Sequence, residues 1–371
     1  MTDNNENKVL NVPHLRFPEF SGEWKKCKLG DLCNVLMCKR ILVSQTNTED
    51  GVPFYKIGTI GSTPDAYISK ELFDDYKVKY NYPRKGEVMI TCAGTVGKCV
   101  VYDGEDAYFQ DSNIVWIDNP TQYISNGFLF HLLSKVDWRK LNSTTIIRIY
   151  NDDLRNLKMS YPRKEEQQKI SHLLSLLDER IATQNNIIYK LKSLIRGIAQ
   201  NMVHRGKPNV RLSDCMICNS STLQESEVLE SGTYPVYGAN GIVGYLDCYA
   251  TLNEAIYIIK DGSGVGTVFY VAGKCSAAGT LNTLQAKEGY SLQYLYYLLT
   301  VFNFEPYKTG MAIPHIYFKD YGKAKVFCPS HSEQFKYTKL LSTIDSKLLA
   351  EQNALVNYNL QKQYLLRQMF I

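Results

Sequence analysis

The sequence predicts an α+β fold made by tandem duplication, in which each of two modules is followed by a long helix. Three observations support this prediction: residues recur at a constant offset, apolar residues recur every three or four positions in two stretches, and the segments between resemble short strands. With 371 residues the chain is long enough for two or three domains. Its 44% hydrophobic and 21% charged residues are typical of a folded protein.

A repeat with an offset of 167 residues organises the chain. The repeat is densest from residue 149 onward, where composition alone would produce few matches. It predicts that the second half of the chain folds like the first. The identical pairs include Ile149 and Ile316, Pro162 and Pro329, Glu166 and Glu333, Gln167 and Gln334, Asp178 and Asp345, and Met202 and Met369.

The similarity continues upstream in a weaker form. Pro53 to Gly97 in the first copy is thirteen residues longer than Pro235 to Gly266 in the second. Insertions collect in loops, and loops carry binding residues, so this stretch is expected to be a loop involved in binding.

Short strands are predicted for most of the two modules, with one short helix in each. The strand segments are rich in β-branched and aromatic residues and are bounded by Gly, Asp or Asn. We expect strands at 86–92, 113–117, 255–259 and 266–271, and short helices around 128–133 and 295–299.

Each module is followed by a stretch with the three-four apolar spacing of a coiled-coil seam. Ser330 and Glu333 have the spacing of a capping box at the second helix, and Gly206 and Pro208 end the first. The alternative is that each helix packs only on its own module, because one apolar stripe does not identify its partner. The predicted seam residues are Leu174, Leu177, Ile181, Ile188, Leu191, Ile195, Ile198, Met202, Leu341, Ile344, Leu348, Leu355, Tyr358, Leu365 and Met369.

These elements give a predicted domain organisation. It comprises an N-terminal tail at 1–19, a first module at 20–160, a central helix at 161–206, a second module at 207–328 and a distal helix at 329–371.

Charge and targeting signals restrict the function less than the repeat does. The formal net charge is +5, and residues 161–210 hold nine Lys and Arg against four Asp and Glu. A basic helix face is weak support for nucleic-acid binding, since it can simply be solvated. With no signal peptide and no apolar run long enough to span a bilayer, we expect a cytoplasmic protein without membrane contact, whose ten cysteines are free thiols.

This layout and its motifs resemble the DNA-specificity subunit of type I restriction-modification systems. The resemblance covers nearly the whole chain. The first copy departs from the motif that ends each module, because Arg148 stands where the second copy has His315, and no proline precedes it. The motifs are Phe17-Pro-Glu-Phe20, Lys28-Leu-Gly-Asp31, Pro162-Arg-Lys-Glu-Glu-Gln167, Pro329-Ser-His-Ser-Glu-Gln334 and the segment from Gly310 to Asp320.

The resemblance implies a non-catalytic subunit that recognises DNA. Each module would be a target recognition domain for one half of a bipartite asymmetric site in double-stranded DNA. The helices would pair as an antiparallel coiled coil that spaces the modules and docks two modification (methyltransferase) subunits. S-adenosylmethionine, Mg²⁺ and ATP would belong to partner subunits, including the restriction (endonuclease and translocase) subunits, so the resemblance implies no cofactor or metal in this chain.

Catalytic and metal-binding alternatives have weaker support in the sequence. An adenine methyltransferase needs an Asn- or Asp-Pro-Pro-aromatic loop to hold a flipped base, and Asp118-Asn-Pro-Thr121 has one proline and no aromatic residue. Asp65, Asp75 and Lys77 have a nuclease-like but degenerate spacing. Cys215 and Cys218 form a lone Cys-x-x-Cys, so a zinc site is not favoured.

Two glycine-rich segments, 94–98 and 262–266, could be strand-to-strand turns or could present amides to a phosphate. His315 could contact a base or be a satisfied turn residue. A second reading of the whole chain is a protein-interaction scaffold of two β-rich modules on a coiled coil that binds no DNA. Under the DNA-binding reading, the candidate contact residues are Lys39, Arg40, Lys56, Lys98, Arg148, Tyr237, Asn240, Lys260, Thr309, His315 and Lys319.

Overall fold

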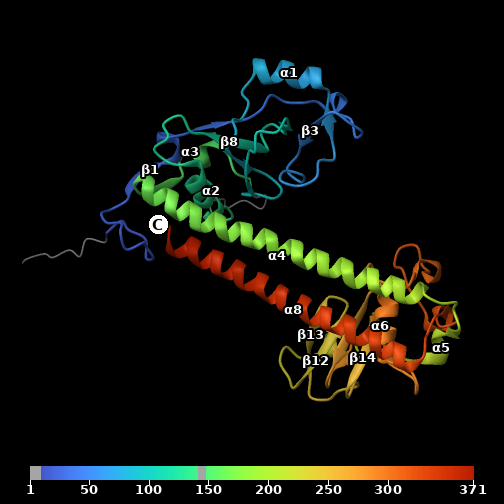
Figure 1. The fold of residues 1–371 in the computed structure, drawn as a ribbon. Coiled ribbons are helices and arrows are strands. Elements are labelled where there is room, and N and C mark those ends of the chain that lie inside the picture. Colours follow the sequence, from blue (N-terminus) through green and yellow to red (C-terminus); the bar gives the residue numbers. More distant parts are fainter. Residues whose placement is uncertain (1–9, 141–147) are drawn as a thin grey trace, which may run out of the picture. The chain divides into compact units, whose positions relative to one another are not determined.

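The computed structural model describes residues 10–140 and 148–371, which fold into two compact units (Figure 1). Unit 1 contains the described residues up to Thr183 together with Leu355–Ile371, and unit 2 contains Gln184–Ala354. Both long helices, α4 (Lys164–His204) and α8 (His331–Gln368), contribute residues to both units. Since the units cut across both helices, the domain boundaries expected from the sequence stay predictions. The α+β duplication with a long helix after each module is confirmed.

Unit 1 contains three small sheets. Their strand orders are β2-β8-β5-β6, β4-β3-β7 and β1-β9, and only the β3 and β7 pair is parallel. The elements are β1 (Lys25–Lys28), η1 (Leu29–Asp31), β2 (Asn34–Leu36), η2 (Val43–Gln45), β3 (Val52–Tyr55), β4 (Tyr67–Ile68), α1 (Lys70–Lys79), β5 (Val88–Thr91), β6 (Cys99–Val101), β7 (Tyr108–Phe109), β8 (Ile114–Asp118), α2 (Asn126–Lys135), α3 (Asn151–Arg155) and β9 (Lys158–Tyr161).

Unit 2 repeats this arrangement strand for strand. Its sheets have the orders β11-β17-β14-β15, β13-β12-β16 and β10-β18, again with one parallel pair, between β12 and β16. The elements are β10 (Val210–Arg211), α5 (Leu212–Cys215), β11 (Met216–Ser220), η3 (Glu225–Glu227), β12 (Tyr234–Gly238), β13 (Gly241–Leu246), β14 (Glu254–Ile259), β15 (Val268–Ala272), β16 (Ser276–Ala277), β17 (Leu281–Ala286), α6 (Leu292–Thr300), η4 (Glu305–Tyr307), α7 (Phe318–Tyr321) and β18 (Lys325–Val326).

The extra residues of the first copy form helix α1, so the expectation of a loop there is wrong. Ser69 caps this helix by accepting a hydrogen bond from the backbone N–H of Leu72. Phe73 is fully buried in the module, and Lys70 and Lys77 both pair with Asp106. A capped helix with a buried aromatic anchor is a structured addition to the module.

A buried glutamine fixes each module on its long helix. In unit 1, Gln167 of α4 accepts a hydrogen bond from the N–H of Ser125 (2.7 Å) and donates to the carbonyl of Pro162 (2.9 Å). Ser125 is also the N-cap of α2, so one side chain ties α2 to the start of α4. In unit 2, Gln334 makes the same bonds to Ser291 (2.9 Å) and Pro329 (2.9 Å). This pair of contacts explains why the Glu-Gln motif recurs in the two copies.

Helices α4 and α8 run antiparallel where they pair within each unit. In unit 1, Asp178 forms an ion pair with Lys362. In unit 2, the amide nitrogen of Gln184 donates to the carbonyl of Glu351 (3.0 Å), and Arg205 donates to the hydroxyl of Tyr337 (2.6 Å). Partner numbers fall along α8 as they rise along α4, which is the antiparallel order. Every predicted seam residue is buried or half-buried.

The C-terminal end of α8 completes the core of unit 1. Leu366, Met369 and Phe370 are buried there, with the Phe370 ring 4.8 Å from that of Phe128. At the equivalent place in unit 2, Met202 of α4 is buried in the core. The apolar end of one helix therefore serves the module that precedes the other helix.

No helix among the described residues is both long enough and apolar enough to cross a membrane.

Candidate nucleic-acid interface

Three of the predicted contact residues of unit 2 come together where β14 turns into β15. Lys260 follows β14 directly, and its carbonyl accepts from the N–H of Ile316 (2.9 Å). Thr309 and His315 bond to each other through both backbone groups, at 2.9 and 2.7 Å. The segment that ends the module is therefore hydrogen-bonded to the β14–β15 turn. This contact brings the three residues to one edge of unit 2.

His315 is held by a carboxylate that the sequence analysis missed. Its Nδ1 lies 2.6 Å from Oδ1 of Asp261, and both side chains are about one-third exposed. This contact favours the satisfied turn histidine, because the ring is oriented by Asp261 from the neighbouring turn. The local sequence gave no sign of the pairing, since the two residues are 54 positions apart.

The other three candidates of unit 2 lie elsewhere. Tyr237 of β12 packs edge-on against Tyr257, and Asn240 is exposed in the turn between β12 and β13. Lys319 is exposed on α7, with its ammonium 5.2 Å from the centre of the Tyr317 ring. Lys319 therefore retains a cationic group in solvent that could meet a phosphate.

Two arginines of unit 1 flank one turn. Arg40 pairs with Asp111 (3.0 Å), and Arg148 donates to the carbonyl of Ser112 (3.3 Å). Ser112 has a φ of 54°, a left-handed conformation that is uncommon for serine. The arginines and this turn make a compact basic edge in unit 1. Arg148 occupies the repeat position that His315 occupies in unit 2.

The three predicted lysines of unit 1 all have intramolecular partners. Lys56 pairs with Asp65 (2.9 Å), Lys98 donates to the carbonyl of Ile60 (2.5 Å), and the Lys39 ammonium lies 5.4 Å from the centre of the Tyr80 ring. Lys98 thus supports the loop after β3, which reduces its freedom to contact a ligand.

The carboxylates of the nuclease-like pattern are engaged by lysines. Asp65 contacts Lys56, and Asp75 contacts Lys79 at 2.5 Å. Within residues 10–140 and 148–371 there is no group of three or more His, Cys, Asp or Glu side chains placed to hold a metal ion.

The remaining sequence alternatives also have structural answers. Residues 94–98 connect β5 to β6 and residues 262–266 connect β14 to β15, so both glycine segments are strand-to-strand turns. In the Cys-x-x-Cys pair, burial raises the pKa of the Cys218 thiol to about 11, so this thiol is protonated at neutral pH.

Comparison with known proteins places the chain in a family. Residues 21–193 and 208–358 match the family described as "Type I restriction modification DNA specificity domain", and together these ranges cover most of the chain. The chain belongs to this family. The repeat found in the sequence therefore corresponds to two successive specificity domains.

Individual members of the specificity family extend this result. A Haemophilus influenzae protein named as a type I restriction enzyme specificity subunit is 46% identical over 180 residues, which are 48% of this chain and 44% of that protein. The match thus spans less than half of that relative. A crystal structure of the type I restriction-modification S subunit from M. genitalium aligns with a TM-score of 0.65 at 18% identity, covering 97% of this chain and 99% of that one. A structure solved to explain complex assembly and conformational transition of the type I system aligns with a TM-score of 0.53 at 16% identity, covering 95% and 98%.

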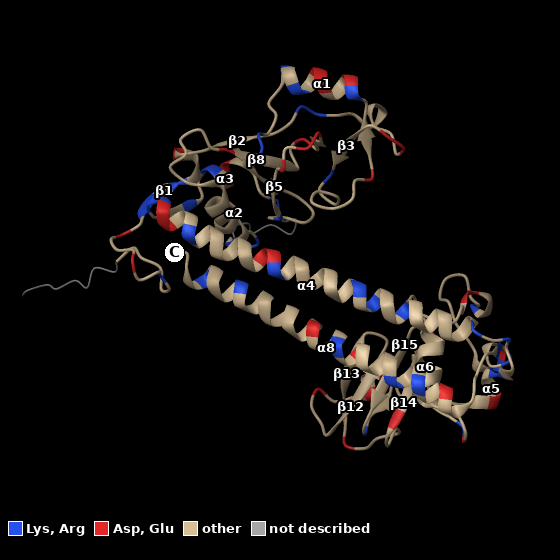
Figure 2. Ribbon diagram, viewed as in Figure 1, with Lys and Arg blue, Asp and Glu red and all other residues tan. Residues whose placement is uncertain are grey.

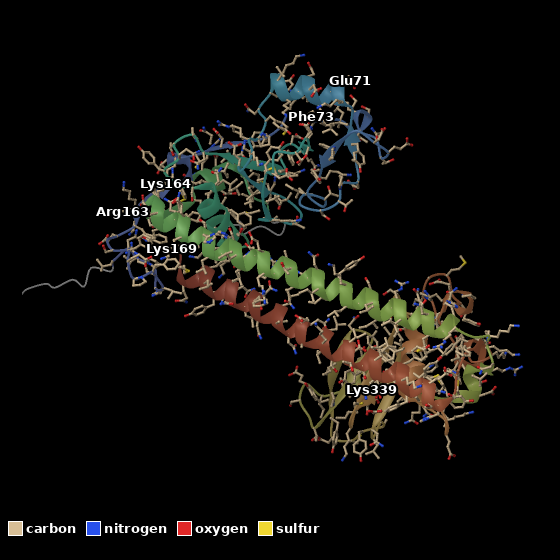
Figure 3. The ribbon with its side chains drawn as sticks, viewed as in Figure 1. Glu71, Phe73, Arg163, Lys164, Lys169 and Lys339 are labelled. Carbon is tan, nitrogen blue, oxygen red and sulfur yellow. The ribbon has the colours of Figure 1, made fainter. Side chains whose placement is uncertain are left out.

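The two long helices of the specificity domains carry 11 of the 42 Lys and Arg residues of the chain. Lys and Arg side chains are spaced along α4 (Figure 2). Arg163, Lys164 and Lys169 lie at its start (Figure 3), where Lys169 is paired with Glu19. Part of this charge is therefore neutralised within unit 1.

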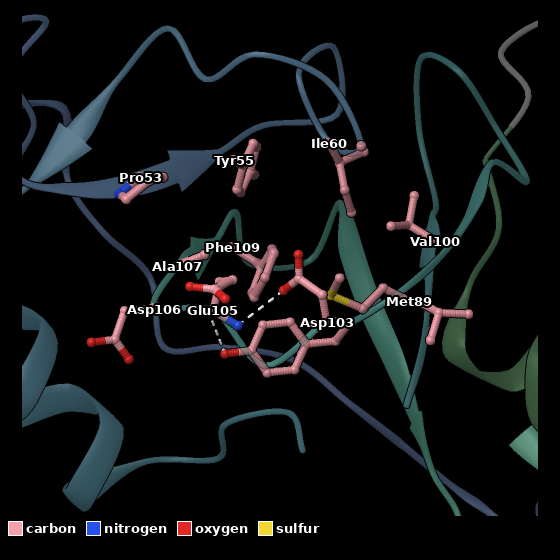
Figure 4. A pocket seen from close by; sticks show the side chains of 13 residues that line it. Pro53, Tyr55, Ile60, Met89, Val100, Asp103, Glu105, Asp106, Ala107 and Phe109 are labelled. Atoms are coloured by element: carbon pink, nitrogen blue, oxygen red, sulfur yellow. Dashed lines mark hydrogen bonds between the residues drawn. The ribbon is translucent and has the colours of Figure 1, made fainter. Parts of the chain in front are cut away.

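A small cavity inside the first specificity domain has the wrong character for a phosphate site. It measures about 130 Å³ and lies beside the aromatic rings of Tyr55 and Phe109 (Figure 4). Asp103, Glu105 and Asp106 line its rim. Carboxylates repel a phosphate, so we do not include this cavity in the candidate interface.

Proposed function

We propose that this chain is the DNA-recognising subunit of a type I restriction-modification assembly. Each module recognises one half of a bipartite, asymmetric site in double-stranded DNA, and the paired helices space the modules and dock two modification subunits. The observation that carries this proposal is the strand-for-strand repetition of two specificity domains, each fixed to its long helix by an equivalent glutamine. Duplex DNA has local two-fold pseudosymmetry, which two related modules can meet with equivalent surfaces.

Different contact edges support recognition of different half-sites. The edge in unit 2 carries Lys260 and Thr309 and is held in place by the His315–Asp261 pair, whereas the edge in unit 1 is built around Arg40, Arg148 and the Asp111 turn. Different side chains present different donors and acceptors to base edges. An asymmetric site is the expected consequence.

An exposed apolar stripe on α8 supports the docking role. Val356, Leu360 and Tyr364 follow one another at four-residue spacing, and each is more than half exposed. Residues spaced by four lie on one helical face, and apolar side chains gathered there are typical of a protein contact. We assign this stripe to a modification subunit.

The chemistry of modification and cleavage is assigned to partner subunits. S-adenosylmethionine would be bound by the modification subunits, and ATP and Mg²⁺ would serve the restriction subunits. The full chain alone, incubated with duplex DNA, Mg²⁺ and S-adenosylmethionine, should neither methylate nor cleave it. Cleavage abolished by Asp75→Asn would contradict this assignment.

A module exchange tests the proposal directly. Methylated adenines are first mapped in DNA from cells that carry the system, which identifies both half-sites. Residues 20–160 are then replaced by the corresponding module of a relative. One half-site should change and the other should stay the same, since each module acts on its own half.

Binding measurements with and without a modification subunit provide the control. The mapped site should bind more tightly than random duplex at every salt concentration, because base contacts add to the phosphate contacts that any duplex offers. Equal binding of random and mapped duplex would reject the DNA-specificity role and favour a scaffold. A change of both half-sites after the exchange would reject one module per half-site.

A further inference from the structure

The segment that ends the second module projects two apolar side chains into solvent. Met311 is fully exposed, with a relative exposure of 105%, and Ile313 is 58% exposed. Both lie at the tip of the loop Thr309–His315, and we call these two residues the apolar tip. Single exposed apolar residues are ordinary on a protein surface, but these two are neighbours on one loop.

The loop that carries the apolar tip is fixed at its base. Thr309 and His315 bond to each other through their backbones, and the His315 ring is held by Asp261. The N–H of Gly262 donates to the carbonyl of Pro314 (3.0 Å). The contacts from Asp261 and Gly262 come from the β14–β15 turn, so the loop is anchored to the largest sheet of unit 2.

Two residues of the loop set its tight curvature. Gly310 has a φ of 87°, and a Cβ atom there would lie 2.4 Å from the carbonyl oxygen of Ile313. Pro314 restricts its own φ and disfavours a helical conformation at Ile313. The loop is thus held in a shape that presents Met311 and Ile313, and the folded unit keeps them out of its own core.

The surroundings of the apolar tip suit a polyanion. Residues 309–317 contain no acidic side chain. Lys319 follows the loop, with its ammonium beside the Tyr317 ring. The nearby carboxylates of Asp261, Glu305 and Asp320 lie beside His315, Lys308 and Lys323 respectively. Methionine, isoleucine and proline are among the residues that proteins insert between base pairs, with cations on the adjacent phosphates.

We propose that the apolar tip of Met311 and Ile313 is a wedge that inserts into a base step of the half-site recognised by unit 2. This inference rests on the proposed function, because it takes duplex DNA as the ligand. It adds that recognition includes unstacking of one base step. The specificity of this half-site would then depend partly on how easily that step opens.

The test uses the full chain assembled with its modification subunits, without S-adenosylmethionine. The probes are duplex oligonucleotides carrying the mapped site, with the fluorescent adenine analogue 2-aminopurine replacing, in turn, each adenine in and beside the site except the methylated adenines. The wild type should raise the fluorescence severalfold at one step of one half-site. Met311→Ser/Ile313→Ser should abolish that rise, whereas Ile242→Ser/Leu252→Ser, which changes two other exposed apolar residues of unit 2, should keep it.

A second measurement keeps the test decisive if the wedge variant binds poorly. An abasic site at the responsive step removes the unstacking cost, so the wild type should bind it about tenfold more tightly than intact duplex. The variant should bind abasic and intact duplex equally, or bind the abasic duplex alone. Circular dichroism checks that the variant is folded.

The remaining outcomes contradict the wedge. Site-specific binding by the wild type with no fluorescence rise at any step would overturn it while leaving the proposed function intact. If the fluorescence rise persisted in the folded variant, the contact would be assigned to other residues. The same would follow if the folded variant bound neither the intact nor the abasic duplex. Absence of site-specific binding by the wild type would instead reject the proposed function.

Discussion

The two copies keep the contact that fixes each module to its helix and differ in the contact beside it. Gln167 and Gln334 bind equivalent backbone groups. About three helical turns further along α4, Asp178 lies near His131 of α2 and pairs with Lys362 of α8. In unit 2 the equivalent Asp345 accepts a hydrogen bond from Tyr297 of α6, and Ile195 stands at the position that matches Lys362.

This difference shows which contacts a duplicated scaffold can exchange. The glutamine satisfies backbone groups at the cap of a helix and the start of another, and few side chains could replace it. Asp178 and Asp345 contact side chains, which can be replaced as a set without moving the backbone. The first copy thus has a partly buried ionic contact where the second has a neutral donor and an apolar neighbour.

The largest effect is expected from lengthening both helices at the layer where Gln184 meets Glu351. Four residues inserted after each position add about 6 Å and largely restore the apolar face. If the helices set the separation of the modules, the original target should be lost and the new one should have a spacer about two base pairs longer, with both half-sites unchanged. Methylation mapping measures this.

Two controls accompany the insertion. Inserting two residues, instead of four, at each position should rotate the apolar seam of each helix away from its partner and prevent stable pairing of the helices. The same four residues in α4 alone should leave α8 short and give no active complex. An unaltered spacer in the folded, active four-residue variant would leave the helices only a docking role.

Removal of the shared glutamine should destabilise each unit separately. Gln167→Ala leaves a buried N–H and carbonyl without partners, so we expect about 3 kcal/mol less free energy of unfolding for unit 1. Urea unfolding followed by tryptophan fluorescence isolates unit 1, which contains all three tryptophans, Trp24, Trp116 and Trp138.

The matched changes sharpen the result. Gln334→Ala should have a similar effect on unit 2, measured by hydrogen exchange of β14. Gln200→Ala, at an exposed position of α4, should have little effect. If Gln167→Ala and Gln200→Ala lowered the free energy of unfolding equally, the buried glutamine would not be what fixes the module to its helix.

The buried His131 of α2 should give unit 1 an acid sensitivity that unit 2 does not gain at the equivalent position of α6, where Tyr297 stands. His131 is 1% exposed, and burial lowers its pKa from the usual 6.5 to about 4. As the pH falls from 6.5 to 4, the unfolded chain binds a proton that the folded chain does not. This histidine should therefore cost unit 1 up to about 3 kcal/mol of stability across that window.

His131→Phe isolates this effect from that of other groups. The difference between wild type and variant in tryptophan-monitored unfolding should change with pH between 6.5 and 4 and be constant above 7.5. Parallel pH profiles would show that His131 is not buried as a neutral ring.

The smallest effect concerns two lysines with different surroundings. Lys319→Gln should lower the slope of log affinity against log salt by about 0.9, with base preference unchanged, because one phosphate contact is lost. Lys98→Gln should instead cost unit 1 about 1 kcal/mol, because the bond to the Ile60 carbonyl is lost. A reduced slope for Lys98→Gln alone would reverse this assignment.

Periodic and repeated features of the fold were predictable from the sequence. The expected strands at 86–92 and 255–259 correspond to β5 and β14, and both long helices begin and end within a few residues of their expected bounds. Helix α1 was not predicted, because its Ser69 cap and Phe73 anchor lie in a segment that has no counterpart in the second copy and was expected to be a loop. Its buried face became visible only when the module surrounding it was known.

The candidate site was less predictable, because its geometry depends on residues far apart in the chain. Exposed cations were chosen near turns, but Lys56 and Lys98 prove to serve neighbouring loops. Asp261 and Asp111, which orient His315 and Arg40, have no local signal that identifies them as partners. Identity between the copies marked Gln167, but its role required the position of Ser125.

The burial of Leu366, Met369 and Phe370 in unit 1 has a consequence for synthesis on the ribosome. Domains commonly fold in the order in which they are translated. Here the residues of unit 2, 184–354, are all made before the end of α8 that fills the core of unit 1. The unit whose translation begins first is therefore completed last. Its core lacks these three side chains, and so stays incompletely packed, until all of unit 2 has been synthesised.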